Sequence, residues 1–153
     1  MPDKEIEIIS QNKKAFHDYT IIDGMEAGIV LTGSEIKSVR ASRVQLREAY
    51  VRIEKGQAWL YNADIAQWSG ASRNNHAPTR PRKLLMHKAQ IADWASRVDQ
   101  KGLTIVPIKM YLKGHYAKVD IALAKGKQQA DKRESIRRRD VEREMQQALK
   151  TRR

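Results

Sequence analysis

Basic and aromatic side chains alternate along residues 105–124, and the chemistry they could perform is the binding of a polyanion. If this segment forms a hairpin, one face is apolar and the other carries Lys109, Tyr111, Lys113, Tyr116 and Lys118. Lysines on a sheet face can contact phosphates while aromatic rings stack on bases. An ordinary solvated face is the alternative, and these five residues alone do not decide between the two.

Two other groups of residues could take part in the same chemistry. Three cations, Arg80, Arg82 and Lys83, stand where a helix is predicted to begin. Cations oppose the dipole at a helix N-terminus, which favours an external anion there. Thr32 and Glu35 have the spacing of a capping box, which alone would account for the glutamate. A carboxylate can also accept hydrogen bonds from a base edge or a 2′-hydroxyl, so both interpretations stay open.

The residue patterns that catalysis or cofactor binding would need are missing. There is no cysteine, no HExxH pattern and no glycine-rich phosphate loop, and the four histidines lie far apart in the sequence. His87 falls on a predicted helix stripe, where we interpret it as a packed or interfacial residue. We therefore predict no enzyme, no metal and no cofactor. An enzyme acting on RNA would require the fold to gather carboxylates.

The charge balance points to nucleic acid or an anionic surface. The chain holds 30 Lys and Arg against 18 Asp and Glu, a net charge of +12, and half of this excess lies in residues 125–153. No apolar run approaches a membrane span, and the first residues lack the pattern of a signal peptide. We expect a monomeric cytoplasmic protein with no membrane partner.

Short alternating segments predict a mainly β fold. Hairpins are expected around Asp23-Gly24, Lys55-Gly56 and Gly114, while Pro107 should meet an edge or a bulge. A short helix is predicted over 33–41, and a longer one from Pro81 to Gly102. The sum is a small OB-like antiparallel β-barrel of about six strands with two or three flanking helices. A strongly curved open sheet fits nearly as well.

Two regions of the chain differ in composition. Residues 1–124 should form the folded domain. Residues 125–153 contain few large apolar residues, which are Ile136, Val141, Met145 and Leu149. Such a thin stripe cannot offset the entropy of ordering the chain, so we predict a basic tail that is disordered when free.

Several segments, in order along the chain, resemble the SsrA-binding protein family, also called small protein B. They are residues 12–19 (NKKAFHDY), 26–40 (EAGIVLTGSEIKSVR), 80–87 (RPRKLLMH), 123–127 (LAKGK) and 131–133 (DKR). The resemblance implies a bacterial RNA-binding adaptor with an OB-like barrel. Such a protein binds the tRNA-like part of transfer-messenger RNA and brings that RNA to stalled ribosomes for trans-translation.

The resemblance also implies which residues touch RNA. It nominates Glu35, Lys125, Gly126 and Lys127, and nearby Asn12, Lys13, His17, Tyr19, Lys37 and Arg40. The tail would become helical in the messenger channel near the small-subunit decoding region, through Asp131, Lys132, Arg133, Ile136, Arg137, Arg138 and Arg139. The alternative function is a general OB-fold protein that binds single-stranded nucleic acid.

Overall fold

The structure is a computed structural model that describes residues 5–70 and 75–127. Its elements, in chain order, are β1 (Ile6–Gln11), α1 (Lys13–Asp18), β2 (Tyr19–Ile29), α2 (Gly33–Arg40), β3 (Val44–Gln45), β4 (Tyr50–Glu54), β5 (Gln57–Tyr61), β6 (Asp64–Ile65), β7 (Arg82–Leu85), α3 (Lys88–Lys101), β8 (Thr104–Lys113) and β9 (Tyr116–Gly126). The fold is therefore mainly β with a few helices, as the sequence predicts. The predicted tail residues from 128 onward lie outside the described residues.

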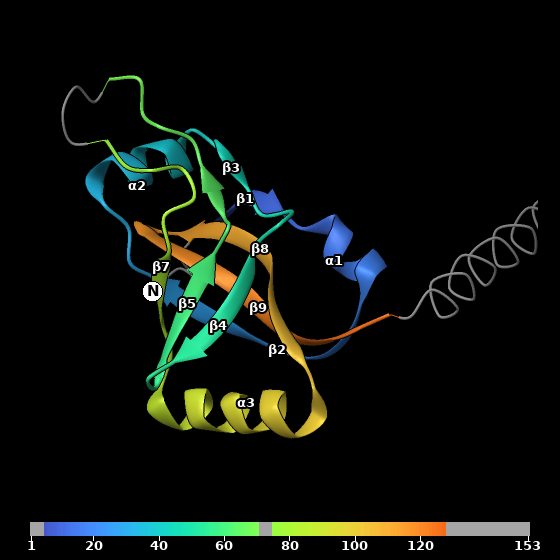
Figure 1. The fold of residues 1–153 in the computed structure, drawn as a ribbon. Helices are drawn as coiled ribbons and strands as arrows, with labels where there is room; N and C mark the ends of the chain where they lie inside the picture. Colours follow the sequence, from blue (N-terminus) through green and yellow to red (C-terminus); the bar gives the residue numbers. More distant parts are fainter. Residues whose placement is uncertain (1–4, 71–74, 128–153) are drawn as a thin grey trace, which may run out of the picture.

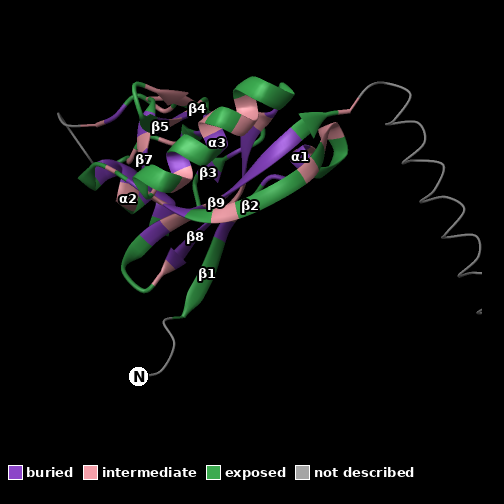
Figure 2. Ribbon diagram, turned by 90° about the horizontal axis from the view of Figure 1, so that it is seen from below, coloured by how far each residue is buried: buried purple, intermediate pink, exposed green. Residues whose placement is uncertain are grey.

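Seven strands form one antiparallel sheet in the order β1-β8-β4-β5-β7-β2-β9, and β8 also pairs with β9. The pairings from β8 through β4, β5, β7, β2 and β9 thus return to β8. Helix α3 lies across one end of these strands and α2 lies at the other end (Figure 1). Buried positions concentrate on the strands, whereas α3 has exposed positions on its outer side (Figure 2). Trp94 of α3 is among the core residues.

The predicted turns at Lys55-Gly56 and Gly114 are confirmed. Both glycines have positive φ, as does Lys55, and they join β4 to β5 and β8 to β9. The register of β8 against β9 shifts between Pro107 and Lys109. A proline cannot donate to the ladder, and the predicted irregularity lies at this point.

The predicted hairpin at Asp23-Gly24 is wrong, because β2 runs through both residues. The register between β2 and β9 shifts between Ile21 and Asp23 instead. The carboxylate of Asp23 accepts hydrogen bonds from the Gly24 amide at 2.8 Å and from Arg97 of α3 at 2.9 Å. The Asp-Gly pair therefore marks a bulge that ties the strand to a helix.

The predicted start of the long helix at Pro81 is also wrong. Arg82 and Leu84 are buried while Leu85 is exposed, which is the alternation of a strand. This strand, β7, fills the position between β5 and β2. Helix α3 begins only at Lys88, and His87 is its exposed N-cap residue rather than a packed one.

Candidate nucleic-acid interface

Helix α1 is anchored on the bulge of β8 by Asn12. The side chain of Asn12 caps the helix by accepting from the Ala15 amide at 3.3 Å, and its Nδ2 donates to the Pro107 carbonyl at 2.9 Å. Its backbone N–H donates to the Ile108 carbonyl at 2.7 Å. Asn12 is 4% exposed. Both ends of its amide are already bonded, so its role in this structure is to place α1.

The last residues of β9 lie against α1 and the start of β2. Tyr19 stands opposite Gly126 in the ladder. The backbone N–H of Lys127 donates to the Asp18 carbonyl at 2.9 Å, and its Nζ donates to the Phe16 carbonyl at 3.3 Å. Sequence positions more than a hundred residues apart are thereby joined at one end of the molecule.

We call this surface the α1–β9 cluster, and define it as Lys13, His17, Lys125, Gly126 and Lys127. The resemblance nominated all five as RNA-facing residues, and Lys13, His17, Lys125 and Gly126 are exposed. Tyr19 lies beneath them, against a small apolar cluster of Ala15, Val106 and Ala124. The cluster therefore has an apolar base that orders it and a cationic outer surface that suits phosphates.

Glu35 lies in a different environment, in a group that we call the α2 ion-pair cluster (Glu35, Arg80 and Arg82). Glu35 and Arg82 have no exposed side-chain surface. The Glu35 carboxylate lies 2.5 Å from Nε of Arg82 and 2.6 Å from Nη2 of Arg80. Burial would raise the pKa of Glu35, but hydrogen bonds from Arg80, the Thr32 amide and Arg82 lower it to about 2.

The interpretation of Glu35 as a capping residue is confirmed. Its carboxylate accepts from the Thr32 amide at 2.8 Å, while the Thr32 hydroxyl accepts from the Glu35 amide at 3.3 Å. The part that sequence reasoning missed is the pair of arginines. Because they and the cap enclose the carboxylate, RNA has no accessible atom of Glu35 to bind in this structure.

Arg82 also holds the long connection between β5 and β7, which includes β6. Its Nη1 donates to the Ala63 carbonyl at 2.6 Å, and its Nη2 donates to the Pro78 carbonyl at 3.0 Å. The interpretation of Arg82 as a cation awaiting an external anion is therefore wrong. The buried guanidinium has internal acceptors, and the helix dipole that motivated this interpretation is absent at that position.

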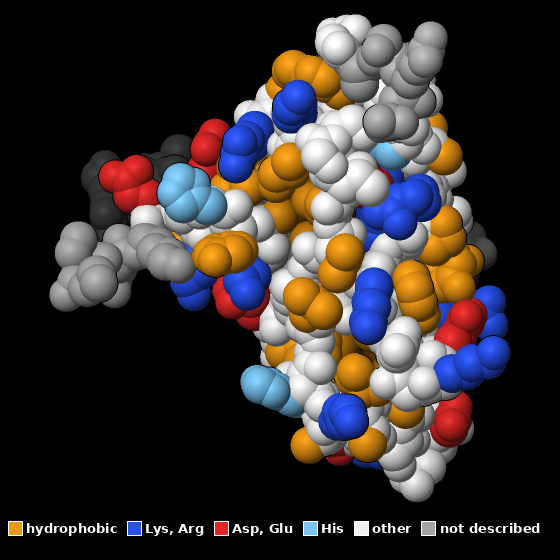
Figure 3. Space-filling view, turned by 90° about the vertical axis from the view of Figure 1, so that its left-hand side faces the viewer, with side chains coloured by type: hydrophobic (Ala, Val, Ile, Leu, Met, Phe, Trp, Pro, Cys, Tyr) orange, Lys and Arg blue, Asp and Glu red, His pale blue; other side chains and the backbone are white. Residues whose placement is uncertain are grey.

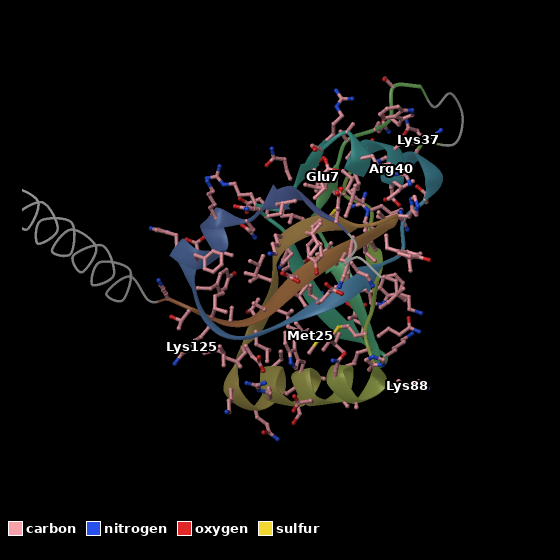
Figure 4. All side chains as sticks on the ribbon, turned by 180° about the vertical axis from the view of Figure 1, so that it is seen from behind. Glu7, Met25, Lys37, Arg40, Lys88 and Lys125 are labelled. Carbon is pink, nitrogen blue, oxygen red and sulfur yellow. The ribbon has the colours of Figure 1, made fainter. Side chains whose placement is uncertain are left out.

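The remaining predicted residues of this region, Lys37 and Arg40, are exposed on α2. Neither forms an ion pair within residues 5–70 and 75–127. Figure 4 shows both on the opposite end of the molecule from Lys125. The nominated residues thus fall into two separate groups rather than one site.

The alternating face of the β8–β9 hairpin is only partly available. Tyr111 is buried, and its hydroxyl donates to Glu26 and, at 3.0 Å, to Asp120. Burial and these two carboxylates raise the pKa of Tyr111. Lys109 lies 3.5 Å from Asp120, and Lys113 lies 3.8 Å from Glu26. Tyr111 therefore cannot stack on a base. Tyr116 is the exposed member, and Lys118 is partly exposed and absent from the ion pairs of the described residues.

Tyr116 and Lys118 border a hollow of about 270 Å3 together with Leu85 of β7. Leu85 and Tyr116 are 54% and 62% exposed. A side chain at Gly28 would place its Cβ 3.2 Å from that of its ladder partner Leu85, so a larger residue would crowd Leu85 there. Figure 3 shows hydrophobic and basic side chains intermixed over the face that includes β7. Because a helix was predicted here, Leu85 was not recognised as an exposed strand residue. The alternation of buried and more exposed positions from Arg82 to Leu85 indicates the strand.

Other chemistry finds less support in the described part of the chain. Residues 5–70 and 75–127 contain no group of three or more His, Asp or Glu side chains placed to hold a metal ion. In the same ranges, no helix has the length and apolar character needed to cross a bilayer.

Comparisons with known proteins place these surfaces in context. The family described as SmpB protein matches residues 9–151. An SsrA-binding protein of Shouchella clausii is 53% identical over 97% of this chain and 95% of its own. Another, of Carboxydothermus hydrogenoformans, is 52% identical over 95% of this chain and 97% of its own.

A solved structure is similar over most of the chain as well. It is described as "tmRNA-SmpB: a journey to the center of the bacterial ribosome", and it superposes with a TM-score of 0.67 at 43% identity. The match covers 84% of this chain and 94% of the solved one.

Proposed function

The chain belongs to the SmpB family of SsrA-binding proteins, and from that membership we propose that it is an RNA-binding adaptor rather than an enzyme. It binds transfer-messenger RNA (tmRNA) and works with it on the ribosome in trans-translation. The observation that carries this function is the family match over residues 9–151, together with the solved tmRNA–SmpB relative. Its place of action is the cytoplasm of a bacterium.

The fold that presents the RNA-binding residues is an OB-like barrel. The succession of paired strands that returns to β8 supports this, since closure removes the free edges of a sheet. Strands β4 and β8 pair at one position only, Val51 with Ile105. The β4–β8 junction is therefore the weakest in the barrel. Residues 1–124 would form this domain and 125–153 the tail, whose first two residues continue β9 in the sheet.

The tRNA-like part of tmRNA binds the exposed cations and the apolar hollow between β7 and β9. Support comes from the cations of the α1–β9 cluster and from Leu85, Tyr116 and Lys118, which offer phosphate and stacking contacts. Glu35 acts as a positioning residue, because it holds Arg80, whose side chain is 36% exposed, at the surface. The tail residues nominated above contact the decoding region and the messenger channel.

Competition binding tests the function directly. Unlabelled tRNA-like fragment of tmRNA should displace the labelled fragment from the full chain far better than a single strand of equal length. Equal displacement by a homopolymer would support the general single-strand binder instead. RNA recovered with the protein from cells identifies the natural partner independently.

Truncation after Ala130 tests the division into domain and tail. The shortened protein keeps Lys125 and Lys127, so it should bind the tRNA-like fragment with a modest loss from reduced long-range attraction. Tagging in a reconstituted translation system should nevertheless fail. Normal tagging would refute a role for the tail, and a collapse of fragment binding would place the primary site within it.

A further inference from the structure

A row of partly exposed aromatic rings lies on the outer face of β4 and β5. Tyr50 and Tyr61 are cross-strand partners whose rings stack at 5.5 Å between centroids and 14° between planes. Trp59 lies two residues from Tyr61 and so shares its face. The core residues of β5 are Ala58 and Leu60, on the other face. The core therefore does not require these three rings.

The need to stabilise the sheet explains why some of these aromatic residues occur on this face. A stacked cross-strand pair stabilises a sheet, which explains Tyr50 and Tyr61. It does not explain Trp59, whose cross-strand partner is Arg52 on β4 and Lys83 on β7. A partly exposed indole whose ladder partners on both sides are basic residues can stack on an unpaired base while the cations contact phosphates.

Polar contacts hold the Tyr61 ring, and the Tyr50 ring stacked on it, before any ligand binds. The Tyr61 hydroxyl donates to both carboxylate oxygens of Glu54, at 3.1 and 3.2 Å. Arg52 lies 3.5 Å from Glu54, and its guanidinium lies 6.0 Å from the centre of the Tyr61 ring. A surface whose rings are already held in place loses little conformational entropy when a flat ligand stacks on it.

A hollow of about 320 Å3 adjoins the rings. Its walls include Trp59, Tyr61 and Pro81, and its polar rim is formed by Glu54, Lys55 and Gln57. Lys55 and Lys83 form no ion pair within the described ranges of the chain. The hollow thus combines ring walls for a base, an amide and a carboxylate for its edge, and nearby cations for phosphates.

We propose that this surface, the aromatic platform (Tyr50, Trp59 and Tyr61 with Lys55 and Lys83), binds an unpaired nucleotide of tmRNA by stacking. The inference rests on the proposed function and adds a contact outside the α1–β9 cluster. The charge of Lys55 and Lys83 suits RNA. The platform is also continuous with the hollow between β7 and β9, since Lys83 and Leu85 lie on the same side of β7.

The test measures binding of the tRNA-like fragment of tmRNA to the full chain and to three variants. Trp59→Leu removes the aromatic face and keeps an apolar side chain, so affinity should fall by about 5- to 100-fold, the loss of one base stack. Trp59→Phe should retain most of the affinity. Trp68→Leu removes a partly buried indole elsewhere and should bind like the wild type. Melting temperatures establish that every variant is folded.

Fluorescence supplies a readout that a structural role would not change. RNA should quench part of the tryptophan emission of the wild type, and Trp59→Leu should lack that part. Oligoglutamate serves as a stand-in for an acidic protein. If it quenches the same tryptophan emission and added RNA does not displace it, the platform binds an acidic protein and the inference is overturned. Wild-type affinity in folded Trp59→Leu would overturn the platform alone. A wild-type protein without preference for the tRNA-like fragment would overturn the proposed function, and the inference with it.

Discussion

The α2 ion-pair cluster and the α1–β9 cluster both contain basic residues, but these have opposite surroundings. Arg82 is enclosed with Glu35 and bonded to carbonyls. Lys125 is exposed, and Lys127 donates from its backbone amide and its Nζ to two backbone carbonyls of α1. A cation that is neutralised internally serves the fold, whereas an exposed cation such as Lys125 keeps its charge available for a partner. Net charge alone therefore says little about which cations bind RNA.

Removing the charge of Glu35 should give the largest effect and would sharpen this comparison. Glu35→Gln preserves a capping side chain but leaves the buried Arg82 without its counter-charge. We expect a loss of about 3–5 kcal/mol in the free energy of unfolding, measured by urea denaturation. The matched control is Glu48→Gln, which breaks the exposed Lys14 pair and should cost less than about 1 kcal/mol. Unchanged stability together with lost RNA binding would assign Glu35 to direct contact.

Lowering the pH should weaken the same ion pair in the wild-type protein and so reduce its free energy of unfolding. The folded pKa of Glu35 is about 2, below its ordinary 4.5, so its contribution is present above pH 4.5 and disappears as the pH falls toward 2. The contribution amounts to roughly 3 kcal/mol. The Glu35→Gln variant should lack this pH-dependent contribution. The difference in unfolding free energy between the wild type and the variant should therefore shrink as the pH falls from 4.5 toward 2. A constant difference would contradict the depressed pKa.

Loss of the α1 anchor should be the next effect in size. Asn12→Ala removes both the cap and the bond to Pro107, and we expect a loss of about 1–3 kcal/mol. Hydrogen exchange should rise first in α1. The control is a core substitution such as Ile65→Val, which lowers stability but leaves α1 in place. At equal loss of stability, Asn12→Ala should lose more RNA affinity than this control, because the α1–β9 cluster loses its geometry. Equal affinities would separate α1 from RNA binding.

Removing the charges of Lys125 and Lys127 should have the smallest effect on stability. Lys125→Ala combined with Lys127→Ala should change the free energy of unfolding by about 0.5 kcal/mol at most. The slope of the logarithm of tmRNA affinity against the logarithm of salt concentration should fall by roughly 2. Lys37→Ala with Arg40→Ala gives the matched pair at the other end. A larger slope change for that pair would reverse the assignment of the two regions.

Sequence patterns predicted the features that depend on local chemistry. The capping box at Thr32, the turn at Gly56 and the irregularity at Pro107 each follow from one or two residues and were confirmed. The assignment failed at Leu84, whose spacing from Ile91 fits a helix although the sheet requires a strand there. Pairing between distant strands decides such cases.

The candidate site shows the same division. The resemblance nominated residues within 12–19, 35–40 and 125–127 as RNA-facing without placing them relative to one another. The structure brings Phe16 and Lys127 together and puts Lys37 and Arg40 at the other end (Figure 4). The burial of Tyr111 could not be foreseen, because Glu26 and Asp120 come from two other strand positions. The platform residue Trp59 had no nominated role, since its neighbour Lys83 was placed in a helix.

The hydrogen bonds of Arg82 affect how well the connection between β5 and β7 can tolerate inserted residues. One guanidinium holds Ala63, where the connection from β5 to β7 departs, and Pro78, where it returns. The amide of Ile65 closes the same gap by donating to the Pro78 carbonyl. With the ends clasped, the closure entropy of the segment between them grows by only about 0.6 kcal/mol for each doubling of its length. A peptide inserted between Trp68 and Asn75, away from the buried Ile65 and His76, should therefore leave the sheet undisturbed.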